Sequence, residues 1–363
     1  MIRFIHAADL HLDSAFVSLD PEEARLRRQE LRDLPEKLAE LARGRKADLV
    51  LLPGDLFDGS EVYPETVERL RLALERMACP VFIAPGNHDP CTAASPYLRE
   101  KWPDNVHIFA ERELTEVRLD ALGCVVHGAA FTDADKSDEV LAEFSAPADG
   151  LIHILCLHGN VGDTGGRYGP ITKEQIARSG ADYLALGHVH QHGGLKREGP
   201  VFWAYPGCPA GRGFDELGDK GALYGEIEKG QVRTEFVPLT ERRYRVLRLD
   251  VTGAEPGRLL DEALTAEMER DLCRVIFTGE TGERGVDLPG LEAEFAHRVC
   301  ALQLRDETVV ERDLWERAGE DSLRGLFLEL LRQRGENADE AEREKIARAV
   351  RFGLAAMDGR DLG

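Results

Sequence analysis

The most constraining feature of the sequence is a set of five short apolar runs that each end in a polar motif built from Asp, His or Asn. In chain order the motifs read "ADLHLD", "LLPGDLFD", "APGNHDP", "LHGN" and "LGHVHQH". Apolar runs rich in Val, Ile, Leu and Phe that close on Gly or Pro are typical of buried strands. Because open α/β sheets bind ligands at the carboxyl ends of their strands, the motifs predict one functional edge.

Helical patterns lie between these strand-like runs over roughly the first 240 residues. Leucines at near-helical spacing predict a helix over residues 21–43, which we expect Pro35 to interrupt. A second helix is predicted over residues 64–78, and the segment "GALYGEIEKGQVRTEFVPL" predicts a hairpin turning at Lys229 and Gly230. The pattern predicts an α/β fold, a layered αββα sandwich that occupies residues 1–240.

The rest of the chain has a different organisation. Alternating strand and helix patterns predict a small α+β domain over residues 241–310, with strands at 244–251, 272–278 and 300–304 and helices at 257–269 and 291–299. Residues 311–363 predict a C-terminal helical segment, because two amphipathic stripes follow each other there: Leu323, Leu326, Leu328 and Leu331, then Ile346, Val350 and Leu354.

Composition limits the location, the cysteine chemistry and the binding partners that we expect for the protein. No apolar run approaches the roughly 20 residues of a membrane span, and the first residues lack a signal-peptide pattern, so we expect a cytoplasmic protein without a membrane partner. Seven scattered cysteines without a CxxC pair predict buried, reduced thiols. The net charge of −21 argues against a surface that neutralises many phosphates by itself. Bound divalent cations reverse the local field, so the charge does not exclude a nuclease.

The polar motifs contain a set of donors suited to metal ions. We expect two carboxylates, one amide and four imidazoles at the functional edge: Asp9, Asp55, Asn87, His11, His158, His188 and His190. Within "DLH" and "HVH" the donors are two positions apart, which places them on the same side of an extended segment. The set, without a thiolate, suits two divalent cations such as Mn²⁺, Fe²⁺ or Zn²⁺. Two such ions about 4 Å apart polarise a phosphoryl group, so the pattern predicts hydrolysis of a phosphate ester.

The ordered motifs D-x-H, G-D, G-N-H-D, H and G-H-x-H resemble the calcineurin-like metallophosphoesterases over about residues 1–240. The resemblance implies that Asp55 bridges two metals. One metal would be held by Asp9, His11 and His190, and the other by Asn87, His158 and His188. It further implies that His88 contacts the phosphate and is the candidate proton donor to the leaving oxygen. Asp89 is expected to orient that imidazole.

Further segments resemble the DNA repair exonuclease branch of this family, the SbcD and YhaO type. They are the opening "FIHAADLHLDSAF", the motif "GDLFD", the loop "YPGCPAGRGFDE" and the small domain after residue 240. This resemblance implies a Mn²⁺-dependent 3′-to-5′ exonuclease on single- or double-stranded DNA ends, with the small domain capping the site. It also implies a homodimer, and a coiled-coil ATPase partner of the SbcC class for which the terminal helices are a candidate docking element.

Two positions depart from the branch. Asp58 stands where these nucleases commonly have a histidine tied to exonuclease activity, and Cys208 stands where they usually have a serine. We expect Asp58 and Arg212 to lie at the substrate. Two alternatives therefore stay open: a phosphodiesterase of small molecules or nucleotides with the same fold, and a subunit that mainly binds DNA or its partner.

Overall fold

The structure is a computed structural model of the 363-residue chain, and it describes residues 1–17, 19–59, 62–281, 285–310, 315, 317–336 and 338–357. The chain forms two compact units. The first comprises Met1–Val246, Thr265–Arg274 and Ala296–Leu302, and the second comprises Leu247–Leu264, Val275–Phe295 and Gln303–Gly363.

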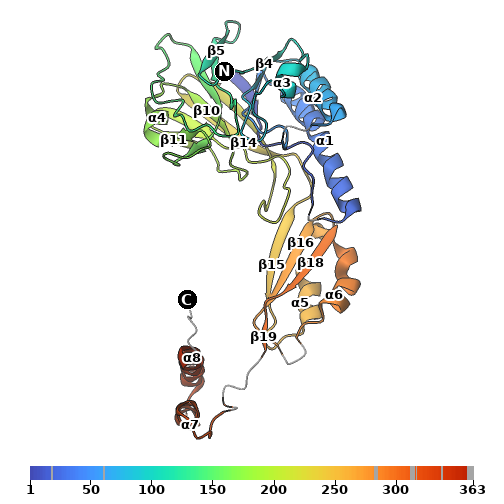
Figure 1. Cartoon of the computed structure of the whole chain (residues 1–363), viewed down its shortest axis with the longest axis vertical. Helices are drawn as coiled ribbons and strands as arrows, with labels where there is room; N and C mark the ends of the chain where they lie inside the picture. Colours follow the sequence, from blue (N-terminus) through green and yellow to red (C-terminus); the bar gives the residue numbers. More distant parts are fainter. Residues whose placement is uncertain are drawn as a thin grey trace. The chain divides into compact units, whose positions relative to one another are not determined.

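Two six-stranded sheets form the first unit (Figure 1). One has the order β14-β13-β1-β2-β3-β4, with strands Gln231–Pro238, Gly221–Glu228, Ile2–His6, Leu49–Leu52, Val81–Ile83 and Val106–Ile108. The other has the order β11-β12-β10-β7-β6-β5, with strands Lys196–Glu198, Val201–Ala204, Tyr183–Gly187, Ile152–His158, Cys124–Gly128 and Thr115–Leu119. Strands β1 to β4 are parallel to one another, as are β6, β7, β10 and β12, so their carboxyl ends share an edge.

The continuous apolar runs supply both faces of each sheet, because successive side chains in a strand point to opposite sides. In β1, Phe4 joins the core between the sheets, whereas Ile5 joins the core on the outer face. Strand β3 divides in the same way, with Phe82 between the sheets and Ile83 outside. Burial on both faces explains why these strands show no polar alternation.

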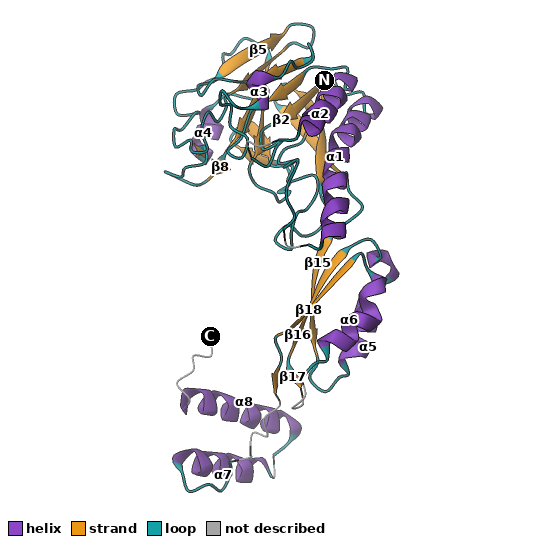
Figure 2. Ribbon diagram, turned by 45° about the vertical axis from the view of Figure 1, so that its right-hand side comes forward, coloured by secondary structure: helices purple, strands orange, loops and turns teal. Residues whose placement is uncertain are grey.

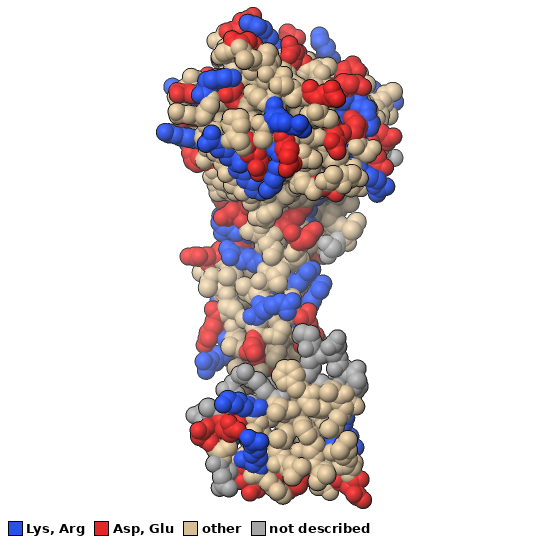
Figure 3. All heavy atoms as spheres, turned by 90° about the vertical axis from the view of Figure 1, so that its left-hand side faces the viewer, with Lys and Arg blue, Asp and Glu red and all other residues tan. Residues whose placement is uncertain are grey.

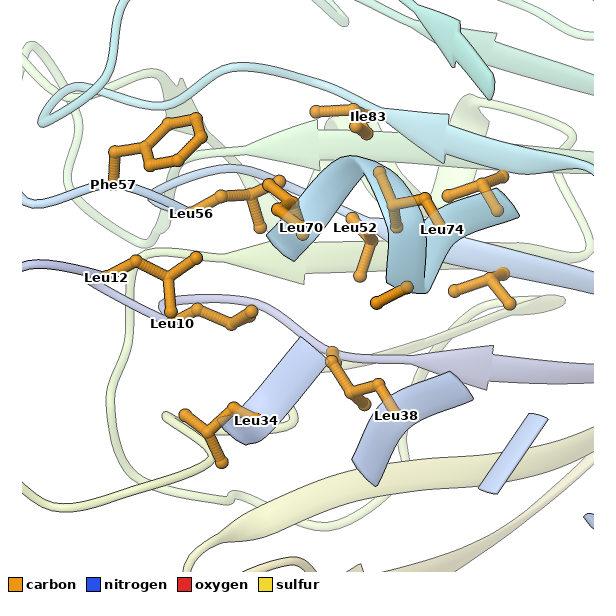
Figure 4. Close-up of a cluster of buried hydrophobic side chains, with 14 of the residues drawn as sticks. Leu10, Leu12, Leu34, Leu38, Leu52, Leu56, Phe57, Leu70, Leu74 and Ile83 are labelled. Atoms are coloured by element: carbon orange, nitrogen blue, oxygen red, sulfur yellow. The ribbon is translucent and has the colours of Figure 1, made fainter. Parts of the chain in front are cut away.

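Helices cover the outer face of each sheet. Helices α1 (Pro21–Gly44) and α2 (Pro64–Arg76) place leucines over the first sheet, and Figure 4 shows Leu38 and Leu74 in this cluster beside Leu52. On the second sheet, Ile176 of α4 (Lys173–Arg178) joins a cluster with residues of β7 and β10. Figure 2 shows the helices outside the two sheets. The predicted αββα sandwich is confirmed.

The predicted interruption at Pro35 is wrong, because α1 continues through it as one helix of 24 residues. A proline in a helix interior removes one hydrogen bond and costs about 3 kcal/mol. The buried face around it offsets this cost: Leu31, Leu34 and Leu38 are all at most 1% exposed, and Pro35 is itself buried. The helix begins at an Asp20 cap that accepts hydrogen bonds from two backbone amides.

A three-stranded sheet in the order β15-β16-β18 follows the sandwich. Its strands are Tyr244–Asp250, Leu272–Thr278 and Ala301–Asp306, close to the predicted strands, with helices α5 (Pro256–Ala263) and α6 (Leu288–Phe295) between them in the chain. The hairpin of β13 and β14 turns at Lys229 and Gly230, as predicted.

Two helices lie near the end of the chain, α7 (Leu323–Gly335) and α8 (Glu340–Met357), and they contact each other. Leu328, Ile346 and Val350 are buried in this pair, while three leucines of α7 stay exposed: Leu323, Leu326 and Leu330. Among the described residues, no helix has the length and apolar character needed to cross a membrane.

Candidate active site

Four loops and the end of one strand, taken from both sheets, bring the predicted donors together. Asp9 and His11 follow β1, Asp55 follows β2, and Asn87 follows β3. In the second sheet His158 is the last residue of β7, and His188 and His190 follow β10. Three donor groups have ligand atoms within 4.8 Å of one another: Asp9, His11 and His190; Asp9, Asp55 and His158; His11, Asp58 and His88. The edge predicted from the strand ends therefore exists.

The backbone at this edge is not extended, contrary to the expectation for residues two positions apart. Asp9 and His11 have φ angles of 56° and 44°, and Asp55 and His188 have 52° and 109°. Such values cost energy for residues other than glycine and persist where surrounding contacts impose them. Here the amides of Asp9 and His11 donate to the carbonyls of Gly54 and Asp55, so the first two loops hold each other.

Two glycines permit the close approach of the loops. Gly54 has a φ of 85°, and a Cβ atom there would lie 2.6 Å from Nδ1 of His158. A Cβ atom at Gly187 would lie 1.9 Å from the carbonyl oxygen of Pro53. Only glycine lets β2 and β10 end this near to each other, which is the structural reason for "PGD" and "LGH" in the two motifs.

Asp55 lies among the donors of both sheets. Its Oδ2 atom is 3.4 Å from Nε2 of His158 and 3.8 Å from Nε2 of His11, and its Oδ1 atom accepts a hydrogen bond from the amide of His88 at 2.9 Å. Burial opposes ionisation of Asp55, but the neighbouring imidazoles outweigh it and hold its pKa below the usual value. Burial and the nearby Asp55 carboxylate raise the pKa of Asp9 well above its usual value.

Three histidines each have one ring nitrogen committed to an oxygen atom. The Nδ1 atoms of His158, His190 and His11 lie 3.0 Å from the carbonyl of Pro53, 2.7 Å from the carboxylate of Glu216 and 3.1 Å from the carboxylate of Asp58, respectively. This arrangement fixes the ring and presents Nε2, as metal-binding histidines do. The inward nitrogens are close together, with the Nε2 atoms of His11 and His190 3.1 Å apart.

Asn87 and His188 complete the donor set. The Asn87 side-chain oxygen lies 2.9 Å from Nε2 of His158 and 3.2 Å from Nδ1 of His188. Burial lowers the pKa of His11 and of His188 to about 4, so both rings are neutral at pH 7 and offer lone pairs. Neutral imidazoles, two carboxylates and an amide oxygen fit two divalent cations.

Cys208 does not belong to the donor set. All seven cysteines are free and six of them are buried, as the scattered spacing predicted. Cys208 is fully buried, and its sulfur faces the His190 carbonyl and the Glu216 carboxylate at 3.5 and 3.6 Å. Burial raises the pKa of this thiol, so it is protonated at pH 7.

The structure corrects the expected role of Asp89. Its carboxylate accepts hydrogen bonds from four backbone amides, those of Asp55, Leu56, Phe57 and Gly86, and from the hydroxyl of Tyr97 at 2.5 Å. These five donors surround Asp89, which is 4% exposed, and turn it away from the imidazole of His88. Asp89 therefore ties the loops after β2 and β3 together rather than orienting His88.

The carboxylate beside the His88 ring is that of Asp58. Its Oδ1 atom lies 3.4 Å from Nδ1 of His88 and 3.1 Å from Nδ1 of His11, and its Oδ2 atom accepts a hydrogen bond from Ser14 at 2.7 Å. Asp58 raises the pKa of His88, whose side chain is 46% exposed, while partial burial opposes that shift. Within this group His88 and Asp58 are thus open to solvent, whereas His11 is buried.

Arg212, the second residue expected at the substrate, lies beside the donor set. Its guanidinium is 3.5 Å from Oδ1 of Asp58, 3.3 Å from Nδ1 of His190 and 3.0 Å from Oε1 of Glu216. Glu216 and Ser14 were not anticipated. Neither belongs to a metal-binding motif, and Glu216 meets His190 because its loop lies against that residue, where the amide of Cys208 donates to the His190 carbonyl at 3.1 Å.

A layered α/β sandwich whose strand ends gather carboxylate, amide and imidazole donors defines a metal-dependent hydrolase. The family model "Calcineurin-like phosphoesterase" matches residues 2–192. The chain belongs to the calcineurin-like phosphoesterase family, which uses a dimetal centre, and it is accordingly a metal-dependent phosphoesterase.

Relatives with similar sequences extend the comparison beyond that segment. The "Uncharacterized metallophosphoesterase YhaO" of Bacillus subtilis (strain 168) is 30% identical over 344 residues, which cover 86% of this chain and 83% of the relative. The "DNA double-strand break repair protein Mre11" of Methanopyrus kandleri is 24% identical, over 90% of this chain and 76% of the relative. The protein of the same name from Aeropyrum pernix is 25% identical, over 76% and 69%. These relatives support the DNA repair exonuclease branch.

Proposed function

We propose that the protein is a Mn²⁺-dependent DNA exonuclease that degrades DNA ends in the 3′-to-5′ direction during DNA repair. The observation that supports DNA as the substrate is the extent of the similarity to the Mre11 double-strand break repair proteins. The likeness covers 90% of this chain in one case, well beyond the residues that match the family model. The donor set at the strand ends supports the dimetal chemistry.

In this proposal Asp55 would contribute to holding both of two Mn²⁺ ions. Asp9, His11 and His190 hold one, and Asn87, His158 and His188 hold the other; the same donors also suit Fe²⁺ and Zn²⁺. When bound, the ions polarise the phosphoryl group and lower the pKa of a water molecule. The protein contributes the fixed rings of His11, His158 and His190, each held through its Nδ1 atom.

His88 is the proposed proton donor to the leaving oxygen. Its Nδ1 atom faces Asp58, which leaves Nε2 for a substrate oxygen, and its exposure lets substrate reach it. Asp58 stands where the related nucleases have a histidine, and it acts here only as an acceptor, from His11 and Ser14. We therefore assign Asp58 to holding His88 at the substrate, and Arg212 to binding a phosphate oxygen beside it.

Other features of the proposal concern assembly. We propose that residues 1–240 form the nuclease domain, that residues 241–310 cap its site and that residues 311–363 dock a coiled-coil ATPase of the SbcC class. The exposed leucines of α7 support a docking role, because exposed apolar stripes mark interaction sites. A homodimer formed through helices of the nuclease domain completes the proposal, and light scattering of the purified protein tests it. A cytoplasmic location is part of the same proposal.

One observation favours a different substrate. The chain carries a net charge of −21, and Figure 3 shows acidic and basic side chains interspersed on the face of the larger unit turned toward the viewer. Nucleic-acid surfaces are usually basic. A phosphodiesterase of small molecules or nucleotides with the same centre is therefore the second candidate. A subunit that mainly binds DNA or its partner is a weaker one, because the full donor set is present.

The test is Mn²⁺-dependent hydrolysis of end-labelled linear duplex DNA beside bis-p-nitrophenyl phosphate. The proposal predicts that the wild-type protein cleaves both, that the labelled end reports 3′-to-5′ loss, and that His88→Ala cleaves neither. Cleavage of the small diester alone, also with the ATPase partner present, would contradict the DNA substrate and favour the second candidate. Cleavage of neither substrate by the wild-type protein would contradict both enzymatic candidates.

A further inference from the structure

A fully buried arginine, Arg27 of α1, lies outside the metal centre but contacts a loop that belongs to it. Its side chain is 1% exposed, and one guanidinium nitrogen donates to the carbonyl of Gly211 at 2.6 Å. Another pairs with Glu30, which also accepts from Arg242 at 2.9 Å. Removing a charge from water costs several kcal/mol unless partners hold it. Arg27 is therefore fixed, and it fixes the carbonyl that it binds.

The bound carbonyl lies in the loop of residues 207–218, which packs against the first residue of β15. The Tyr244 ring meets Phe214 edge to face at 5.0 Å, and the Arg27 guanidinium lies 5.7 Å from the centre of the Tyr244 ring. A Cβ atom at Gly211 would lie 3.2 Å from Tyr244 and 2.8 Å from the Glu216 carbonyl, so this loop leaves no room at Gly211. Arg27 thus contacts the loop 207–218 at Gly211, and Tyr244 contacts it at Phe214.

The same loop supplies the carboxylate that fixes a proposed metal ligand. Glu216 accepts from the amide of Arg212 at 2.7 Å, and its other oxygen lies 2.7 Å from Nδ1 of His190. Burial disfavours the charge of Glu216, but His190 and Arg212 outweigh it and hold its pKa below the usual value. Arg212 directly follows Gly211, so a shift of that carbonyl moves the residue to which Glu216 is bonded.

We propose that Arg27 and Glu216 are positioning residues of the metal centre. Arg27 holds the Gly211 carbonyl, the loop 207–218 keeps Glu216 at Nδ1 of His190, and Glu216 in turn presents Nε2 of His190 to its metal. This inference rests on the proposed function in one respect, the assignment of His190 to one of the two metals. The affinity for the metal bound by Asp9, His11 and His190 therefore depends on Arg27. The affinity for the metal bound by Asn87, His158 and His188 does not.

The test is a Mn²⁺ titration of the purified protein by calorimetry, with electron paramagnetic resonance to detect coupling between the two ions. Glu216→Ala is expected to weaken one of the two binding steps by about 10- to 100-fold, the range seen when such supporting partners are removed. Arg27→Met is expected to weaken the same step, with partial rescue in Arg27→Lys, which keeps a charge and a donor. The second step stays unchanged in all three, and the coupling signal falls at subsaturating Mn²⁺.

Matched controls separate this role from a general loss of stability. Arg25→Met removes an exposed arginine from the same helix and leaves both steps unchanged. Should Arg27→Met fail to fold, Glu30→Gln loosens Arg27 without removing it and is expected to weaken the same step. Equal weakening of both steps, or no change in either for the folded variants, overturns the inference. Failure of the wild-type protein to bind two Mn²⁺ ions instead overturns the proposed function on which it rests.

Discussion

The Oδ1 atom of Asp58 lies 3.4 Å from Nδ1 of His88, so the exposed imidazole of the site is backed by a carboxylate from the neighbouring loop. The same oxygen is 3.1 Å from Nδ1 of His11. A single carboxylate thus connects a proposed metal ligand with the proposed proton donor, and its removal has consequences that differ from the loss of either histidine.

Asp58→Asn is expected to lower kcat for bis-p-nitrophenyl phosphate by about 10-fold or more, because the charge that holds His88 as a proton donor is lost. Metal binding falls less, since the amide oxygen still accepts from His11. Asp104→Asn, a change at an exposed carboxylate away from the site, serves as the control. An unchanged kcat at saturating Mn²⁺ would contradict the role of Asp58.

Tyr97→Phe removes one of the five donors to Asp89 and is expected to cost about 1 to 3 kcal/mol of unfolding free energy, as when a buried polar group loses a hydrogen-bond partner. Turnover of the folded, Mn²⁺-loaded variant stays close to that of the wild type, because the pair supports the loops and does not touch substrate. Urea unfolding and steady-state kinetics check the two halves of this prediction. A loss of kcat without a loss of stability would instead show that Asp89 takes part in the reaction.

The free energy of unfolding is expected to decrease as the pH falls, because of one buried histidine outside the site, His127. His127 and His153 lie on neighbouring strands with ring nitrogens 3.0 Å apart, and burial lowers the pKa of His127 to about 4. In the unfolded chain His127 has a pKa of about 6.5, so below that pH it binds a proton that it does not bind in the folded chain. The free energy of unfolding therefore decreases as the pH falls from about 6.5 to about 4, by at most about 1.4 kcal/mol per pH unit.

His127→Gln isolates this effect, because glutamine does not titrate and every other histidine stays in place. In the presence of a chelator, the unfolding free energy of wild type minus variant is expected to fall between pH 6.5 and pH 4.5. A difference that is constant with pH would show that His127 is not held neutral by the fold.

The sequence predicted the elements that depend on local pattern. Strand β16 begins and ends at the predicted residues, and the hairpin turn at Lys229 and Gly230 follows from its glycine. The edge that gathers Asp9, Asp55 and His158 could be predicted because the carboxyl ends of parallel strands coincide.

The features that the sequence did not reveal depend on contacts between distant segments. Helix α1 passes through Pro35 because its neighbours are buried, which tertiary packing decides rather than local propensity. Asp89 follows His88 directly, yet three of its five donors are amides more than 30 residues away. Glu216 reaches His190 across 26 residues, and no spacing rule signals that contact.

The measurement that tests the central claim most directly is the count of bound Mn²⁺ per chain, made together with hydrolysis of bis-p-nitrophenyl phosphate. Wild type, His88→Ala and Asp55→Ala are compared. The account predicts two ions and turnover for the wild type, and two ions with kcat lowered by about 10²- to 10⁴-fold for His88→Ala. It predicts loss of bound metal for Asp55→Ala. Loss of bound metal in His88→Ala, or two ions retained in Asp55→Ala, would contradict it.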